Sequence, residues 1–437
     1  GAGAIRLAHE LAGAEVDAVI VLGDLAGAHH RTPVVVPWSN GDLLSPPLLV
    51  NTLAASVRAA AGIPSPAAGL GGQLVRLAFP FALTEQAPFV SAGLPAVLLS
   101  VSGDEPPRPD EARANASQVT ALGAAVLQTV DALDRGPAVP APSSYLVIAG
   151  KPVPIWALRL LVLALILPVL ATVVDALART RRRGHSVLRW VGWVLAGAVP
   201  FVVGVGVLLL ARLAGLLSAA PPGAVLADAV PLRSGDVIVL VGVGVAMVLA
   251  QMLLRPVCLR AVAAMAGQPG RRPETPAADA AAVALALVMT LLTLLIWLRD
   301  PFSALLLVPA LHLWLWLTQP GLRARRWALV TVSVVALIPA AVVLVYYANA
   351  YALSPAGLLW SGALMVAGGA MPAAVALCWA LALGCAGDAL VIATRAARAT
   401  RAARERAPAL QAPVTVRGPA GYAGPGSLGG TESALRR

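Results

Sequence analysis

Apolar residues follow two patterns along the chain, and the change between them falls close to Pro154. Before that point, short β-rich apolar runs alternate with stretches whose apolar residues recur at helical spacing. We predict helices over 5–11, 46–61 and 117–133, the last with Ser117 as its N-cap, and strands over 18–22, 74–79 and 96–100. Strands that alternate with helices are typical of an α/β sandwich, so residues 1–135 are expected to form an α/β domain.

A proline-rich segment over 136–154 is predicted to be a linker that leads into a membrane region at 155–393. This region holds about seven apolar stretches near the roughly 20 residues that a helix needs to cross a bilayer. The pattern therefore predicts an all-α polytopic transmembrane bundle. The candidate spans are 155–178, 190–217, 237–254, 280–298, 302–317, 328–347 and 358–383. The last apolar stretch runs on to Ile392, so we expect either a break near Pro372 or a helix that continues into the cytoplasm.

Arginines are distributed unequally between the loops that join these spans. The segments after the first, third, fifth and seventh spans are rich in arginine, whereas the other loops contain little beyond Arg233 and Arg299. Because basic loops stay in the cytoplasm, the asymmetry predicts a cell-membrane protein with an extracytoplasmic N-terminal domain and a cytoplasmic tail at 394–437. Tyr346, Tyr347 and Tyr351 cluster at the predicted outer end of the sixth span, as in an aromatic belt.

Composition agrees with a membrane protein. Hydrophobic residues make up 59% of the chain and charged residues only 12%, against about 25% in a soluble domain. The net charge of +11 does not indicate nucleic-acid binding, because the arginines lie between apolar runs; the lipid bilayer is the expected partner. Apart from Lys151 the positive residues are all arginine, which suggests a GC-rich, bacterial coding sequence. The basic tail at 394–437 has few bulky apolar residues and is predicted to be disordered.

The cysteines and the start of the chain add two expectations. Cys258, Cys378 and Cys385 lie in or beside apolar spans, so the N-terminal domain has neither a disulfide framework nor a cysteine-based zinc site. The chain opens Gly-Ala-Gly without Met or a signal-peptide core, which we interpret as a start inside a longer polypeptide.

Two motifs in the N-terminal domain resemble those of a known family. Residues 22–27, L-G-D-L-A-G, resemble the N-L-D-M-I-G strand end of the di-zinc aminopeptidases (zinc exopeptidases), which include the glutaminyl cyclases. Residues 84–97, T-E-Q-A-P-F-V-S-A-G-L-P-A-V, look like the family segment S-D-H-x-P-F-x-x-x-G-I-P-A-V. Residues 1–11 are similar to the helix after the family's Glu-Glu motif, and 117–133 to its final helix. The resemblance covers 1–135 and implies the C-terminal half of a peptidase domain.

The resemblance implies one zinc ligand, Asp24, since the Asp of the strand-end motif binds metal in that family. Two departures oppose catalysis: Gln86 stands where the family has His, and 100–115, where the His of its H-T-x-x-D-T motif should fall, contains no histidine. A catalytic zinc usually has three protein ligands, with imidazole prominent among them. We therefore expect a catalytically degenerate domain without a cofactor, or with zinc if the family activity is retained.

Other polar residues have two interpretations each. His29 and His30 are either metal ligands or solvated loop residues, and Asp24 is either a ligand or an acceptor for backbone amides. Glu85 either replaces a lost ligand or is a surface carboxylate. The acids of the next loop are interpreted as solvated; they are Asp104, Glu105, Asp110 and Glu111.

Few ionisable or polar residues are predicted to lie within the membrane. Arg159 and Arg212 are close to span ends and are expected to reach the interface. His312 and Gln251 lie deeper and are expected to form hydrogen bonds between helices.

Together these features suggest a membrane-anchored, extracytoplasmic, peptidase-like protein that no longer hydrolyses peptides and instead binds or scaffolds an extracytoplasmic protein or peptide. Its plan is similar to that of the endoplasmic-reticulum-type membrane metallopeptidases and of the peptidase-like subunit of the GPI transamidase. One alternative is an active membrane zinc aminopeptidase. Another is a transporter or envelope-assembly factor, although the sequence lacks the internal repeats that many transporters show.

Overall fold

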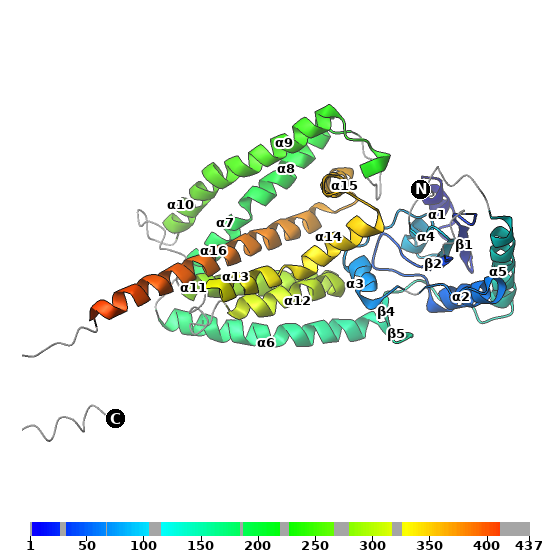
Figure 1. Cartoon of the computed structure of the whole chain (residues 1–437), viewed down its shortest axis with the longest axis horizontal. Coiled ribbons are helices and arrows are strands. Elements are labelled where there is room, and N and C mark those ends of the chain that lie inside the picture. Colours follow the sequence, from blue (N-terminus) through cyan, green and yellow to red (C-terminus); the bar gives the residue numbers. More distant parts are fainter. Residues whose placement is uncertain are drawn as a thin grey trace, which may run out of the picture.

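The N-terminal domain lies at one end of a long helical bundle (Figure 1). The computed structural model describes residues 2–26, 32–66, 68–104, 115–183, 187–218, 227–265, 279–316 and 326–410. The elements of the N-terminal part are α1 (Ala2–Glu10), β1 (Val19–Leu22), β2 (Val34–Val36), α2 (Pro47–Ala61), α3 (Leu70–Ala78), α4 (Gln86–Ser91), β3 (Ala96–Ser100), α5 (Ala116–Asp134), β4 (Tyr145–Ile148) and β5 (Lys151–Pro154).

The bundle is built from the rest of the described chain. Its elements are α6 (Ile155–Arg182), α7 (Val187–Gly197), α8 (Val199–Leu213), η1 (Ala227–Ala229), α9 (Ser234–Leu249), η2 (Ala250–Leu254), α10 (Arg255–Met265), α11 (Asp279–Arg299), α12 (Pro301–Leu315), α13 (Arg326–Val335), α14 (Ile338–Ala350), α15 (Pro355–Gly368) and α16 (Ala373–Leu410).

The N-terminal domain is organised around a small mixed sheet. The strand order is β1-β3-β2, with β1 parallel and β2 antiparallel to β3. All of β3 is buried: Val97 and Leu99 pack with α2 and α5, and Ala96 packs with α1 and α4. This alternation is the two-residue period of a strand. The helices predicted at 5–11, 46–61 and 117–133 and the strands predicted at 18–22 and 96–100 are confirmed. A sheet this small does not identify a peptidase fold, so that part of the fold remains a prediction.

Two local predictions for this domain are wrong. The segment 74–79 is not a strand, because most of it belongs to helix α3. A short apolar run can be a strand or a buried helix, and α3 is buried against the bundle helices α12 and α14. The N-cap of α5 is Asn115 rather than Ser117; the Asn115 side chain accepts a hydrogen bond from the Gln118 amide.

The segment 136–154 is not simply a linker, because its second half is the β4–β5 hairpin. Tyr145 donates a hydrogen bond of 2.6 Å from its hydroxyl to the Ser45 carbonyl. The side chain of Gln73 bonds both backbone groups of Val147, accepting from the N–H at 2.9 Å and donating to the carbonyl at 3.3 Å. Burial raises the pKa of the Tyr145 hydroxyl, so it remains a donor. The chain therefore enters α6 from a hairpin fixed to the domain.

Among the described residues, five helices are long and apolar enough to cross a membrane, in place of the seven predicted. They cover Ile155–Arg182, Val187–Leu213, Ser234–Ala264, Ala280–Arg299 and Ala373–Arg395. A sixth is present if α14 and α15, which are bent by 102°, count as one broken span. The fifth predicted span corresponds to α12, whose 15 residues fall short of the roughly 20 that a bilayer requires.

Prolines explain why the last two predicted spans have other boundaries. The span predicted at 328–347 is divided between α13 and α14, and Pro339 lies in the first turn of α14, where it supplies no N–H to extend α13. The span predicted at 358–383 is divided between α15 and α16. There Gly369 adopts a left-handed φ of 76°, and Pro372 precedes the new helix.

The bundle helices differ in how much of their surface the chain itself covers. In the span formed by α11, 61% of the most apolar stretch is buried by other parts of the chain, against 6% in the span that contains α9. α11 packs against α6, α7, α12 and α16, whereas α9 packs mainly against α8 at one side of the bundle (Figure 1). The exposed apolar face of α9 is what lipid would cover.

Arginine-bearing helix ends lie away from the N-terminal domain. The last turn of α6, with Arg179, Arg181 and Arg182, and helix α10, with Arg255 and Arg260, are at the far end of the bundle in Figure 1. The C-terminal half of α16 also points there. Because α16 extends to Leu410, the first part of the segment predicted as a disordered tail is helical; its alanine and arginine content favours a helix. Residues 411–437 lie outside the described residues.

Candidate functional site

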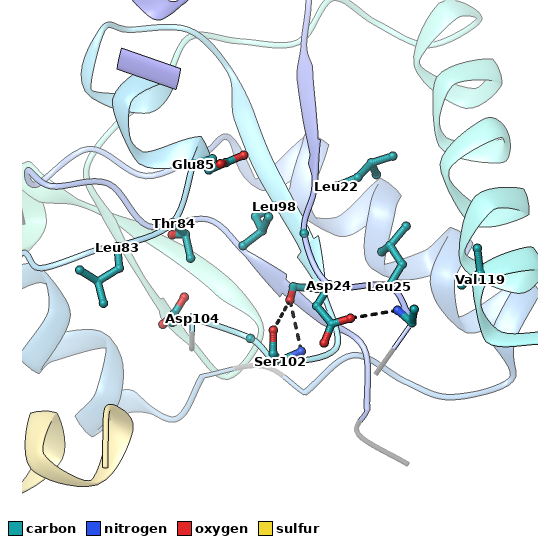
Figure 2. A pocket seen from close by; sticks show the side chains of 14 residues that line it. Leu22, Asp24, Leu25, Leu83, Thr84, Glu85, Leu98, Ser102, Asp104 and Val119 are labelled. Carbon is teal, nitrogen blue, oxygen red and sulfur yellow. Dashed lines mark hydrogen bonds between the residues drawn. The ribbon is translucent and has the colours of Figure 1, made fainter. Parts of the chain in front are cut away.

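A pocket of about 710 Å³ opens at the carboxyl ends of the parallel strands β1 and β3 (Figure 2). In sheets with parallel strands, ligands commonly bind in the crevice at this edge. Its wall comes from the segment after β1, the segment after β3, the loop before α4 and the first turn of α5. The lining residues are Leu22, Gly23, Asp24, Leu25, Ala26, Leu83, Thr84, Glu85, Leu98, Ser100, Ser102, Gly103, Asp104 and Val119.

Close packing of the two strands fixes the position of Asp24. A Cβ on Gly23 would lie 3.1 Å from both Leu98 Cδ1 and Ser100 Cβ, so a side chain there would push β1 away from β3. The Val101 amide donates to the Asp24 carbonyl at 2.7 Å. The Asp24 carboxylate accepts a hydrogen bond of 3.0 Å from the Ala26 amide, which is the turn geometry considered from sequence. Asp24 thus lines the pocket from a rigid strand end, and its role as a metal ligand remains a prediction.

Two serine hydroxyls form the floor next to Asp24. The Ser100 and Ser102 hydroxyl oxygens are 2.9 Å apart, and the Ser102 amide donates to Ser100 Oγ at 3.2 Å. Both side chains are buried. They were not singled out from the sequence, where they look like ordinary strand-end residues.

The loop before α4 contributes the opposite wall. Glu85 is exposed and lines the pocket, whereas Thr84 Oγ1 is buried without a hydrogen-bond partner among the described residues. Gln86, which replaces a family histidine, is fully buried and does not line the pocket. Its side-chain amide donates to the Trp38 carbonyl at 3.0 Å, so Gln86 fixes this loop to the domain.

Asp104 forms the third acidic group, and it is not the solvated loop residue expected from sequence. It makes an ion pair with Arg76, and the two side chains are only 12% and 7% exposed. Burial raises the pKa of Asp104, and the guanidinium offsets this in part. For Arg76, burial alone would lower the pKa, but Asp104 and neighbouring tyrosines raise it above its ordinary value. Arg76 is therefore a permanent cation behind the pocket wall.

Arg76 was also missed from the sequence. Its guanidinium lies 5.5 Å from the ring centres of Trp38 and Tyr346, and its Nε donates to the Tyr346 hydroxyl at 2.7 Å. The available signal was a single arginine inside the apolar run 74–79, since a buried charge requires a partner. Tyr346 belongs to α14, so this group connects the pocket wall to the membrane bundle.

The described residues do not fit a catalytic zinc. They contain no group of three or more His, Cys, Asp or Glu side chains placed to hold a metal ion. Near Asp24 the pocket offers carboxylates and hydroxyls, which suit hard cations better than zinc, and the described lining has no imidazole. His29, His30, Glu105, Asp110 and Glu111 lie outside the described residues.

A second polar group lies inside the bundle. Asp388 of α16 is 2% exposed and accepts a hydrogen bond of 2.7 Å from Arg255 of α10. The guanidinium lies 5.5 Å from the ring centre of Trp193, and a Cβ on Gly197 would come within 2.2 Å of Asp388 Oδ2. The sequence analysis did not identify these two residues as a pair.

The other membrane candidates are less constrained. His312 Nδ1 is 3.0 Å from the Val308 carbonyl of its own helix, so the expected bond between helices is replaced by one within α12. Gln251, Arg159 and Arg212 have exposed side chains.

Comparison with known proteins gives no assignment: no protein-family model matches the chain, and no curated protein sequence is significantly similar to it.

Proposed function

We propose that this chain is a multi-pass membrane protein whose N-terminal domain binds an extracytoplasmic peptide or protein, through a cationic group, in the pocket at the ends of β1 and β3. The observation that carries the proposal is the charge of that pocket. Among the described lining residues the charged ones are Asp24, Glu85 and Asp104, all acidic.

A protonated amine is the group that fits such a lining. Carboxylates and hydroxyls accept hydrogen bonds, and an ammonium group donates three. Hydrogen bonds between charged partners are about twice as strong as neutral ones. The free N-terminus of a peptide, or a lysine side chain of a protein, would present this group at the edge of the sheet.

The proposed orientation rests on the arginines. The basic ends of α6, α10 and α16 are at the opposite end of the bundle from the pocket. Since arginine-rich ends stay in the cytoplasm, the pocket would face outward.

The test uses full-length protein in nanodiscs and two peptides, trialanine amide and its N-acetylated form. We expect the free amine to bind, acetylation to abolish binding, and Asp24→Asn or Glu85→Gln to weaken it about tenfold, the effect of losing one charged hydrogen bond. Asp134→Asn, at the far end of α5, is the control and should bind like wild type. Equal affinity for both peptides would contradict the proposal.

The same samples decide between binding and hydrolysis. We expect mass spectrometry to recover trialanine amide intact and elemental analysis to show no stoichiometric zinc. Chelator-sensitive cleavage with stoichiometric zinc, both lost in Asp24→Ala, would replace this proposal with an active membrane zinc aminopeptidase.

A second candidate function, in transport or envelope assembly, is favoured by the pair Arg255–Asp388. Ionisable residues inside a bundle often mark an ion or substrate path. A proton flux in proteoliposomes, measured with an entrapped pH-sensitive dye and lost in Asp388→Asn, would support this candidate.

A further inference from the structure

The chain segment that leads into the pocket wall is held by the membrane helices. Three backbone carbonyls between Ala78 and Phe81 accept hydrogen bonds from hydroxyls of the bundle, where α3 lies against α12 and α14 (Figure 1). Ser303 of α12 donates to the Ala78 carbonyl at 2.5 Å, and Tyr347 of α14 donates to the Phe79 carbonyl at 2.5 Å. Tyr351, directly after α14, donates to the Phe81 carbonyl at 3.3 Å. Two residues later the same segment forms the pocket lining at Leu83, Thr84 and Glu85.

Aromatic packing reinforces this attachment. The Phe81 ring lies edge-on to Tyr347 and Tyr351, with ring centres 5.8 and 5.4 Å apart. Tyr347 and Tyr351 are 6% and 5% exposed, so they do not form the lipid-facing aromatic belt predicted from sequence. Their hydroxyls and rings instead contact the N-terminal domain, at its junction with the bundle.

A second connection runs through side chains. Asp104 lines the pocket and pairs with Arg76, and Arg76 donates to the Tyr346 hydroxyl on α14. One acidic group of the pocket therefore shares its cationic partner with a membrane helix. A cation that enters the pocket beside Asp104 competes with Arg76 for this carboxylate and repels the guanidinium.

The element that receives both connections is bent and strained. α14 and α15 meet at an angle of 102°, and between them Ala352 adopts a left-handed φ of 50°, which is unfavourable for a residue with a side chain. Such a conformation persists only where its surroundings enforce it. Here those surroundings include Tyr351, which is bonded to the pocket segment.

We infer that binding of a cation in the acidic pocket changes the conformation of the α14–α15 corner through Asp104, Arg76 and Tyr346. The N-terminal domain would then act as a sensor that regulates the membrane bundle. This inference rests on the proposed function of the pocket. Coupling between two sites is reciprocal, so a change in the corner must also change the affinity of the pocket.

The test compares two pocket variants that remove the same charge. In full-length protein in nanodiscs, Asp104→Asn breaks the charged contact with Arg76, whereas Asp24→Asn alters the same pocket without touching Arg76. We expect amide hydrogen exchange over 346–358 to be roughly five- to tenfold faster in Asp104→Asn, the effect of one lost hydrogen bond, and unchanged in Asp24→Asn. Equal exchange in the two variants would overturn the inference.

A variant on the membrane side keeps the test informative if Asp104→Asn does not fold. Tyr346→Phe removes one hydroxyl and leaves every pocket-lining residue intact. We expect it to shift the affinity for trialanine amide at least threefold, whereas Thr172→Val, which removes a hydroxyl that bonds only carbonyls of its own helix α6, should not. Binding of trialanine amide that is identical in wild type and Tyr346→Phe would refute the coupling while leaving the proposed function in place. Faster exchange in Asp104→Asn alone, without any peptide binding, would support the coupling and refute the proposed ligand.

Discussion

Two arginine–aspartate pairs are buried within the described part of the chain, and they differ in what surrounds them. Arg76–Asp104 lies at the junction of the N-terminal domain and the bundle, with the guanidinium 5.5 Å from the ring centres of Trp38 and Tyr346. Arg255–Asp388 lies within the bundle, against Trp193 and Gly197. The first pair has a pocket on one side and a membrane helix on the other, whereas the second joins only bundle helices. A buried ion pair can therefore couple two regions of the molecule only where its two residues contact different regions, as Arg76 and Asp104 do.

Buried ion pairs are weak evidence for stability, because desolvation of both charges offsets much of their attraction. Removing one partner is different, since it leaves the other charge buried without compensation. The two pairs therefore need to be tested one partner at a time, together with the surfaces that hold them.

The largest effect is expected when the junction is removed altogether. Residues 1–135 expressed alone would expose the buried face of α3 and the aromatic segment around Phe81. We expect this fragment to aggregate or to bind a hydrophobic dye without a cooperative thermal transition, in contrast to the full-length protein. A single cooperative transition for the fragment would show that the domain does not depend on the bundle.

The second-largest loss of stability is expected when the Arg76–Asp104 pair is broken. Arg76→Ala leaves Asp104 buried and unpaired and removes the donor to Tyr346, so the free energy of unfolding should fall by about 3–5 kcal/mol. Denaturation of the full-length protein in detergent, followed by tryptophan fluorescence, measures the change. Arg58→Ala, on the exposed face of α2, should stay within about 0.5 kcal/mol of wild type. If the two variants were equally stable, the junction pair would be unimportant.

A smaller effect is expected at the pair inside the bundle. Gly197→Ala places a Cβ within 2.2 Å of Asp388 Oδ2, and overpacking of this kind lowers stability by about 1–3 kcal/mol. Gly242→Ala on α9 is the matched control, because a Cβ there meets nothing within 4 Å. Thermal unfolding of both variants in the same detergent gives the comparison. A Gly242→Ala variant less stable than Gly197→Ala would contradict the packing around Asp388.

Local pattern was enough to predict the strands that carry the pocket. The runs at 18–22 and 96–100 are strands, and the turn residue Asp24 and the loop residue Glu85 were both candidates from sequence. The strands depend on residues close together in the chain, which is why spacing reveals them, whereas Asp24 and Glu85 became candidates through the family resemblance.

Contacts between distant residues were not predictable in the same way. Arg76 and Tyr346 are 270 residues apart, and Arg255 and Asp388 are 133 apart. No periodicity encodes such pairings, so Asp104 looked like a solvated acid and the tyrosines of α14 looked like a lipid-facing belt. The number of spans was overestimated for a related reason: apolar content alone does not show that Pro339 interrupts a helix, although the break near Pro372 was expected.

The orientation proposed above places the pocket outside the cell and the arginine-rich helix ends in the cytoplasm. The direct test is labelling of single cysteines in intact cells with a membrane-impermeant reagent, in a background without Cys258, Cys378 and Cys385. We predict that His30→Cys and Asp110→Cys react from outside, and that Arg182→Cys and Arg325→Cys react only after permeabilisation. Labelling of Arg182→Cys from outside would reverse the orientation and contradict the account.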